Sequence, residues 1–205
     1  PHVHSDDAHP HSLLPSDPAP RVKARESLLV EKGLVDPAAL DAIIETYEQQ
    51  IGPQNGAAVV ARARREPKFR TALFTDATAA VSEMGLYGRQ GEHIVALENT
   101  DRQHNLVVCT LCSCYPWPLL GIPPGWYKSD AYRARAVREP RKVLAEFGLE
   151  LARDVALKTW DSTAEIRYLV IPQQPAGTQG WSAEALAALV TRDAMIGTAI
   201  VPSPA

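Results

Sequence analysis

All three cysteines of this chain lie within one short run, Cys109-Thr-Leu-Cys112-Ser-Cys114. An odd number of cysteines cannot form a complete set of disulfides. Cys112 and Cys114 are also too close in sequence for an unstrained bridge. Thiolates gathered in this way are suited to binding a soft metal ion. The run therefore predicts a metal-binding loop, and the fold must hold that loop in a fixed shape.

Two other interpretations of the cysteines stay open from the residues alone. A structural zinc site needs four ligands, usually supplied by two Cys-x2-Cys or Cys/His pairs, and His104 is the nearest residue that could serve as the fourth. Alternatively, the thiols are ordinary core residues, since free cysteine often packs as a small hydrophobe. The apolar segment 106–109, which has the character of a buried strand, is consistent with that alternative.

The spacing of the thiols favours a catalytic ion. The backbone amides of Ser113 and Cys114 lie between the sulfurs of Cys112 and Cys114. A strongly Lewis-acidic trivalent ion could displace the two amide protons, so that two sulfurs and two nitrogens form a plane around it. Cys109 would cap one side of this plane and leave the other side open. Such donors suit iron or cobalt, and an open position is typical of a catalytic site.

The run from Cys109 to Pro118 resembles the metal-binding motif of the nitrile hydratase alpha chain. The similarity extends over nearly the whole chain, through residues 21–29, 90–93, 107–109, 121–124, 126–129, 160–162, 165–169 and 190–197. Thr110 and Tyr115 resemble the cobalt form of the family, because the iron form usually has Ser and Thr at these two positions.

This resemblance implies an enzyme that hydrates nitriles to amides. It also implies that the bound metal is a cobalt ion (Co3+), with iron (Fe3+) as the alternative. The implied ligands are the sulfurs of Cys109, Cys112 and Cys114 and the amide nitrogens of Ser113 and Cys114. Cys112 would be a sulfinate and Cys114 a sulfenate, which are successive products of thiol oxidation. The ion would polarise the nitrile, and either the Cys114 sulfenate oxygen or a water would attack it.

The resemblance also gives roles to side chains outside the cysteine run. Gln90, which by residue type alone is a loop glutamine, would bond active-site water or substrate as a catalytic residue, and Trp117 would form a wall of the substrate pocket. Four further residues would support the metal loop: Asp161, Glu165, Arg167 and Tyr168. Glu165 and Arg167 alternate along a predicted strand and so share a face, although a solvated ion pair would explain them equally well.

The apolar pattern predicts an α+β chain. We expect a flexible tail over residues 1–19, a helical N-terminal arm and helices over 20–85, and an α+β metal-binding catalytic core over 86–205. Helices are predicted at 21–33, 37–51, 54–65, 67–84, 132–138, 142–147 and 183–191, and strands at 93–98, 105–108, 155–160 and 166–171. The resemblance adds a layered α-β-β-α core behind the helical arm.

Composition limits the partners. The net charge of −3 comes from both signs, which is not the basic footprint of a nucleic-acid-binding protein. No apolar stretch is long enough to span a bilayer, and the start of the sequence shows no signal-peptide pattern. Because reduced thiols that await a metal fit the cytoplasm, we expect a cytoplasmic protein with no nucleic acid and no membrane partner.

The resemblance implies a separate beta subunit, in a heterodimer or heterotetramer, whose arginines pair with the oxygenated sulfurs. It also implies a metallation or activator protein and a small nitrile substrate. Two other functions remain as alternatives: the related metal-bearing subunit of a thiocyanate hydrolase, and a non-enzymatic zinc or redox-sensing module.

Overall fold

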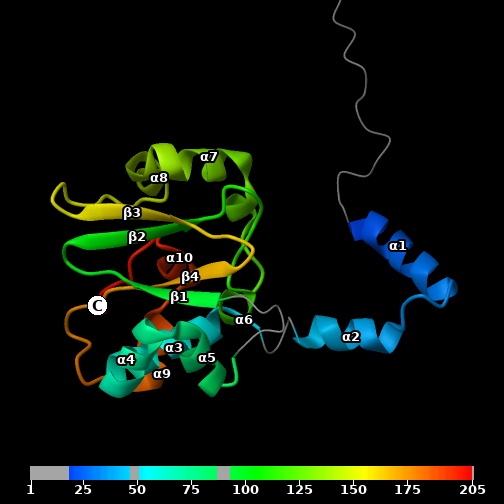
Figure 1. Cartoon of the computed structure of the whole chain (residues 1–205), viewed down its shortest axis with the longest axis horizontal. Coiled ribbons are helices and arrows are strands. Elements are labelled where there is room, and N and C mark those ends of the chain that lie inside the picture. Colours follow the sequence, from blue (N-terminus) through cyan, green and yellow to red (C-terminus); the bar gives the residue numbers. More distant parts are fainter. Residues whose placement is uncertain (1–18, 47–50, 87–92, 205) are drawn as a thin grey trace, which may run out of the picture. The chain divides into compact units, whose positions relative to one another are not determined.

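The chain forms two compact units, residues 1–46 and residues 47–205 (Figure 1). The computed structural model describes residues 19–46, 51–86 and 93–204. The predicted flexible tail therefore lies, except for its last residue, outside the described residues.

The first unit consists of α1 (Ala19–Glu31) and α2 (Pro37–Glu45). Gly33, at φ +65°, follows α1 in the left-handed conformation that glycine favours at helix ends. Asp36 caps α2 by accepting a hydrogen bond of 2.9 Å from the amide of Ala38. The sequence predicts both of these boundaries. However, α2 ends before the predicted residue 51, and residues 47–50 lie outside the described part of the chain.

Three helices begin the second unit: α3 (Pro53–Arg65), α4 (Pro67–Thr75) and α5 (Ala77–Glu83). The prediction of one continuous helix over 67–84 is wrong. Asp76 is extended, at φ −148° and ψ 91°, and its side chain accepts a 2.9 Å hydrogen bond from the amide of Ala79. An aspartate in this position caps a new helix, since its carboxylate satisfies an amide that has no partner within the helix.

The four strands form two parallel pairs. In the first pair β1 (His93–Glu98) lies beside β4 (Ile166–Ile171), and in the second β2 (Gln103–Val108) lies beside β3 (Ala156–Asp161). The turn predicted at 99–101 forms and is closed by a bridge between residues 100 and 103. The two strands that it joins belong to different pairs, so it is not the turn of a hairpin.

Helices lie on the outer sides of both strand pairs (Figure 1). The remaining helical elements are α6 (Trp117–Leu120), the 3-10 helix η2 (Gly125–Lys128), α7 (Asp130–Arg138), α8 (Pro140–Glu146), α9 (Ala183–Leu189) and α10 (Arg192–Ile196). In Figure 1, α7 and α8 flank the β2–β3 pair, whereas α3, α4, α5 and α9 flank the β1–β4 pair. The chain combines helices and strands, which confirms this part of the predicted α+β fold class.

The helices α3, α4 and α5 belong with the strands and not with the arm. Both α4 and α5 contact β1, and α3 contacts α9. These helices bury Val59, Val60, Leu73 and Val81 completely. The second unit therefore starts near residue 47, which differs from the predicted boundary at 85, because the apolar faces of these helices form part of the core.

The end of α10 approaches β2 closely. Gly197 follows α10 with φ +96°, and a Cβ atom built on it would lie 1.9 Å from the carbonyl oxygen of Asn105. Only glycine fits there, since it tolerates positive φ and has no side chain. This contact fixes the position of β2, the strand that leads directly into Cys109.

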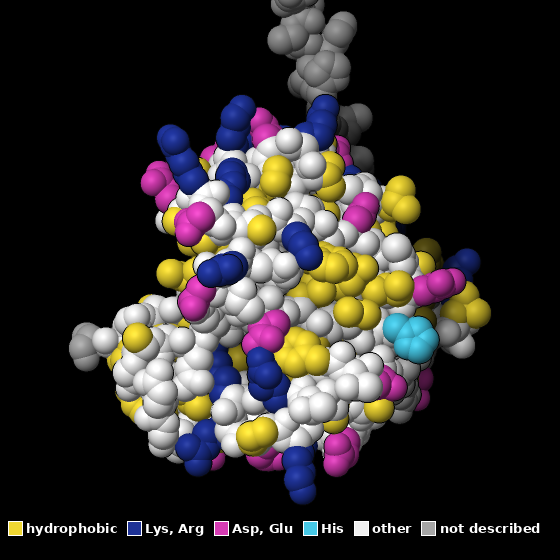
Figure 2. All heavy atoms as spheres, turned by 60° about the vertical axis from the view of Figure 1, so that its left-hand side comes forward, with side chains coloured by type: hydrophobic (Ala, Val, Ile, Leu, Met, Phe, Trp, Pro, Cys, Tyr) yellow, Lys and Arg dark blue, Asp and Glu magenta, His cyan; other side chains and the backbone are white. Residues whose placement is uncertain are grey.

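Acidic and basic side chains are intermixed on the face of the molecule that Figure 2 shows. Within the described residues, no helix combines the length and the apolar character that crossing a bilayer requires.

Candidate metal centre

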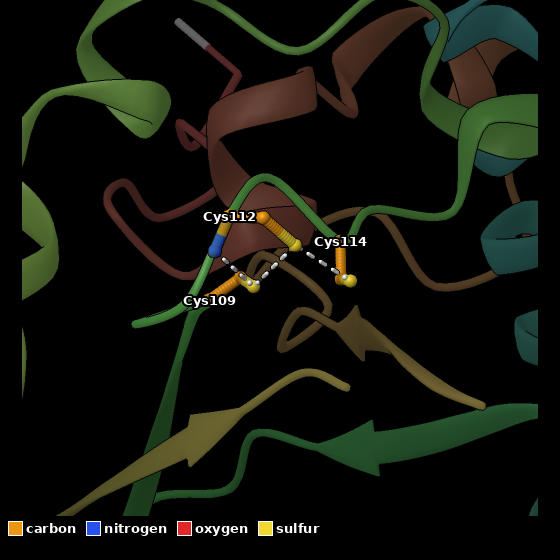
Figure 3. A group of neighbouring side chains, drawn as sticks. All are labelled: Cys109, Cys112 and Cys114. Atoms are coloured by element: carbon orange, nitrogen blue, oxygen red, sulfur yellow. Dashed lines mark hydrogen bonds between the residues drawn. The ribbon is translucent and has the colours of Figure 1, made fainter. Parts of the chain in front are cut away.

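The three cysteine sulfurs converge at the end of β2. Cys109 directly follows the strand and is fully buried, Cys114 is 8% exposed, and Cys112 lies at the surface. Figure 3 shows the three side chains pointing toward one another beneath the arch of the loop. We call residues 109–114 the cysteine loop. Among the described residues, its thiols form a group able to hold a metal ion, with all three sulfurs within 4.8 Å of one another.

The sulfur separations suit a shared ion. The Cys112 sulfur lies 3.5 Å from that of Cys109 and 3.2 Å from that of Cys114. Metal–thiolate bonds of about 2.3 Å at right angles would put two sulfurs about 3.3 Å apart. All three cysteines are free thiols, so each can become a thiolate ligand.

The thiols also differ in how readily they ionise. Burial, followed by the hydrogen bond to Cys112, raises the pKa of Cys114 to about 12, while the charge of Arg167 acts in the opposite direction. The hydrogen bond from Cys114 is the main reason that the pKa of Cys112 is lowered. Of Cys112 and Cys114, the exposed Cys112 thiol therefore ionises more readily, and an arriving cation can reach it.

Asp161 holds the start of the cysteine loop. Its carboxylate, at the end of β3, accepts hydrogen bonds from the amide of Thr110 at 2.9 Å and from the Thr110 hydroxyl at 2.6 Å. Within the loop, the Cys112 amide donates to the Cys109 sulfur at 3.3 Å. The loop backbone is thus tied both to the neighbouring strand and to one of its own sulfurs.

Two residues that the sequence did not single out hold the rest of the loop. The Tyr127 hydroxyl, fully buried in η2, donates to the Cys114 carbonyl oxygen at 2.9 Å. A guanidinium nitrogen of Arg133, from α7, donates to the Cys112 carbonyl oxygen at 3.3 Å. Tyr127 stands in one of the segments that resemble the family, but Arg133 is one of several arginines on a polar helix. No sequence pattern distinguishes it from the others.

Arg167 lies close enough to the loop for its charge to act on Cys114. It is buried on β4, 9% exposed, and donates to the carbonyl oxygen of Thr163. Glu165 comes just before the first residue of β4 and is exposed. Glu165 and Arg167, which the sequence places on one face, therefore differ in burial. Arg167 is buried, whereas Glu165 is exposed.

The remaining predicted residues lie in different settings. The ring of Tyr168 packs on Trp160, with centroids 5.3 Å apart. Trp117 is half-buried at the first position of α6 and packs against the core. Gln90 lies outside the described residues.

His104 has both ring nitrogens engaged and is 4% exposed. Its Nε2 donates to the Gly197 carbonyl oxygen at 2.8 Å, and its Nδ1 lies 3.2 Å from the Asn99 side-chain nitrogen, from which it accepts. These bonds fix a neutral imidazole. His104 is therefore occupied elsewhere, which removes the residue that would have completed a four-ligand zinc site.

Comparison with known proteins gives the family. The family model described as nitrile hydratase, alpha chain, matches residues 16–199. The chain belongs to the nitrile hydratase alpha-chain family. A relative from Rhodococcus rhodochrous, the low-molecular weight cobalt-containing nitrile hydratase subunit alpha, is 58% identical over 186 residues, covering 91% of this chain and 90% of the relative.

Solved structures of this family share the fold. The iron-type nitrile hydratase of Comamonas testosteroni Ni1, solved as a double mutant, aligns with a TM-score of 0.85 and 39% identity, covering 91% of this chain and 95% of that one.

The gamma subunit of thiocyanate hydrolase from Thiobacillus thioparus is 40% identical over 192 residues, covering 88% of this chain and 78% of the relative. Its lower identity makes nitrile hydratase the better match.

Proposed function

We propose that this chain is the metal-bearing alpha subunit of a cobalt-dependent nitrile hydratase, which converts nitriles to amides by adding water. The observation that carries the proposal is the convergence of three free thiols within 4.8 Å at the end of a buried strand. Membership of the nitrile hydratase alpha-chain family supports the same conclusion.

The ligands in this proposal are the sulfurs of Cys109, Cys112 and Cys114 together with the amide nitrogens of Ser113 and Cys114. Soft sulfur and anionic nitrogen donors suit low-spin cobalt or iron. Cobalt is favoured because Thr110 and Tyr115 resemble the cobalt form and because the most similar relative described above contains cobalt. Iron is the alternative, supported by the iron-type structural neighbour.

A bound trivalent ion supplies the Lewis acidity that opens a nitrile carbon to attack. We propose that an external oxygen-donating oxidant, such as dioxygen or a peroxide, converts Cys112 to the sulfinate and Cys114 to the sulfenate and is itself reduced. The Cys114 oxygen then adds to the nitrile carbon, which gives an imidate still joined to sulfur through the S–O bond. Water attacks the sulfur and the S–O bond breaks, so that the original oxygen leaves with the carbon and the water oxygen stays on Cys114 as the new sulfenate. Both protons of that water pass to the nitrogen, which gives the amide. Direct attack by water is the alternative. In a single turnover with heavy oxygen placed on Cys114, label in the amide supports the sulfenate, and unlabelled amide supports water.

Other residues have supporting roles in this proposal. Gln90 bonds the attacking water or the substrate, and Trp117 forms a wall of the nitrile pocket. Asp161 holds the loop through Thr110, and Arg167 offsets negative charge near Cys114. Glu165 and Tyr168 complete the surroundings of the loop.

We propose a beta subunit as the partner, in a heterodimer or heterotetramer, with arginines that pair with the oxygenated sulfurs. The exposed apolar side chains of the first unit support this proposal: Val22, Leu28, Leu29, Leu34, Ile43 and Ile44. Burial of such side chains is the main source of stability in most protein complexes. In the assembled enzyme we expect a helical N-terminal arm that contains α1 and α2, and a layered α-β-β-α core that includes α3, α4 and α5. A metallation protein and a cytoplasmic location complete the proposal.

The test is to produce the chain together with its beta subunit in medium containing cobalt. We expect one cobalt per alpha chain and hydration of small nitriles. The complex is assayed in parallel on thiocyanate. Faster turnover of thiocyanate would replace nitrile hydratase with thiocyanate hydrolase, and a cobalt-free complex without either activity would overturn the proposal.

A further inference from the structure

Arg133 reaches the cysteine loop from α7. One of its terminal nitrogens, Nη1, donates to the Cys112 carbonyl oxygen at 3.3 Å, and the other, Nη2, pairs with the carboxylate of Asp130. Its Nε atom is buried and has no hydrogen-bond partner within the described structure. The side chain is only 22% exposed, so its charge, which is shared between the Asp130 carboxylate and the Cys112 carbonyl oxygen, is partly shielded from water.

The oxygen that Arg133 contacts belongs to a particular peptide group. The carbonyl of Cys112 and the amide nitrogen of Ser113 are the two ends of one peptide unit. If that nitrogen binds a metal ion, it loses its proton, and its negative charge spreads over the peptide unit onto the Cys112 oxygen. A guanidinium bonded to this oxygen then makes a charge-assisted hydrogen bond, which is roughly twice as strong as a neutral one.

We propose that Arg133 is a positioning residue that stabilises the deprotonated Cys112–Ser113 peptide as a metal ligand. The inference rests on the proposed function, because it needs an ion bound in the cysteine loop. In the step concerned, the N–H bond of Ser113 breaks, the proton leaves to solvent, and a bond from nitrogen to the ion forms. Neither oxidation nor reduction is involved.

Tyr127 provides a natural comparison within the same loop. It donates to the Cys114 carbonyl oxygen at 2.9 Å, but that oxygen shares its peptide unit with the nitrogen of Tyr115, which is not a ligand in the proposal. Its phenol is also neutral. Loss of the Tyr127 bond should therefore loosen the loop without changing the charge that a ligand peptide can carry.

The experiment compares four variants in the complex of the full chain with its beta subunit. Arg133→Met removes the guanidinium and keeps much of the side-chain volume, whereas Arg133→Lys retains a positive charge. Tyr127→Phe removes the other loop contact. Arg138→Met is the matched control, because Arg138 lies exposed on the same helix and donates to the carbonyl oxygen of Ala134, away from the loop.

Three quantities are measured: cobalt affinity, the sulfur-to-cobalt charge-transfer absorption, and the melting temperature of the metal-free complex. For Arg133→Met we expect a loss of about 10- to 100-fold in cobalt affinity, the usual effect of removing a group that supports a ligand. Its absorption bands should shift because a nitrogen donor is weakened, while its metal-free melting temperature stays close to wild type. Arg133→Lys should recover part of the affinity. Tyr127→Phe and Arg138→Met should keep the wild-type absorption bands.

The inference is overturned if Arg133→Met binds cobalt with wild-type affinity and absorption. It is also overturned if Tyr127→Phe shifts the absorption bands as much as Arg133→Met does. A third contrary result is that Arg133→Met loses cobalt only because its metal-free complex melts at a lower temperature. A wild-type complex that binds no cobalt would instead contradict the proposed function, so the two failures are distinguishable.

Discussion

At the scale of single residues, the metal centre depends on where each thiol sits relative to the core. Cys109 is fixed by burial at the end of β2, whereas Cys112 is presented at the surface. The sequence predicts the cluster because spacing along the chain limits how far apart three thiols can lie. It cannot predict Arg133 or Tyr127, because their contacts with the loop are set by packing between elements distant in sequence.

The first prediction concerns Cys109. Because this sulfur is buried and points at the other two, Cys109→Ala should abolish stable cobalt binding and nitrile hydration while leaving the fold intact. Metal analysis of the purified complex, together with circular dichroism, checks both statements. Leu111→Ala is the control, since Leu111 is 84% exposed in the same loop and offers no ligand atom. Full cobalt content in Cys109→Ala would contradict the assigned ligand set.

A second prediction concerns pH and His104. Burial is the main cause of its lowered pKa, partly opposed by its bond to Gly197. Protonation of His104 Nδ1 would also place a second N–H opposite the Asn99 side-chain nitrogen, which is itself a hydrogen-bond donor. In the unfolded chain, histidine titrates near 6.5. Below that pH the unfolded state binds more protons than the folded state, so stability should fall as the pH drops.

Urea unfolding of the metal-free chain at a series of pH values tests this prediction. His104 alone should contribute a slope of at most about 1.4 kcal/mol per pH unit below pH 6.5. His104→Gln should flatten the curve in that range. Equal slopes in the wild type and His104→Gln would show that His104 is not the group responsible.

At the scale of elements, single residues such as Gly33 and Asp36 predict where helices begin and end, but the sequence does not predict which strands pair. Gly33 and Asp36 act through their own backbone or side chain, so the boundary that each sets is visible in the sequence. The break at Asp76 was missed because the apolar period continues across it. The parallel pairing of β1 with β4 and of β2 with β3 joins segments that are far apart in sequence, and strand periodicity carries no information about such partners.

A third prediction follows from the contact between α10 and β2. Gly197→Ala should cost about 2–5 kcal/mol of folding stability, from positive φ combined with overpacking against Asn105. Gly177→Ala is the matched control, because Gly177 has φ +80° but nothing within 4 Å of an added Cβ. It should cost only about 1 kcal/mol from the backbone alone. Thermal and urea unfolding of both variants measure the difference, and similar costs would contradict the close approach.

At the scale of the whole molecule, the described residues form one part that has a core, within 47–205, and one part that has none, within 19–46. Residues 47–205 bury the apolar faces of their helices and strands, whereas α2 in the first unit has no buried residue. The sequence predicts helices with an apolar side there, but it cannot show whether that side is covered by the same chain. In the proposed function, the beta subunit is the partner that covers this side.

A fourth prediction is that the exposed apolar side chains of α2 bind the partner. Ile43→Asp and Ile44→Asp should each weaken association with the beta subunit by at least about tenfold, the effect expected when a buried apolar anchor is lost. Asp41→Asn, on the same helix, is the control and should have little effect. Calorimetric titration with the beta subunit provides the measurement, and wild-type affinity in both isoleucine variants would exclude α2 from the interface.

The most direct test of the central claim is metal analysis of the purified complex combined with the mass of the peptide that contains residues 109–114. We expect one cobalt per chain, with two oxygens added at Cys112 and one at Cys114. Stoichiometric zinc with three unoxidised thiols would contradict it.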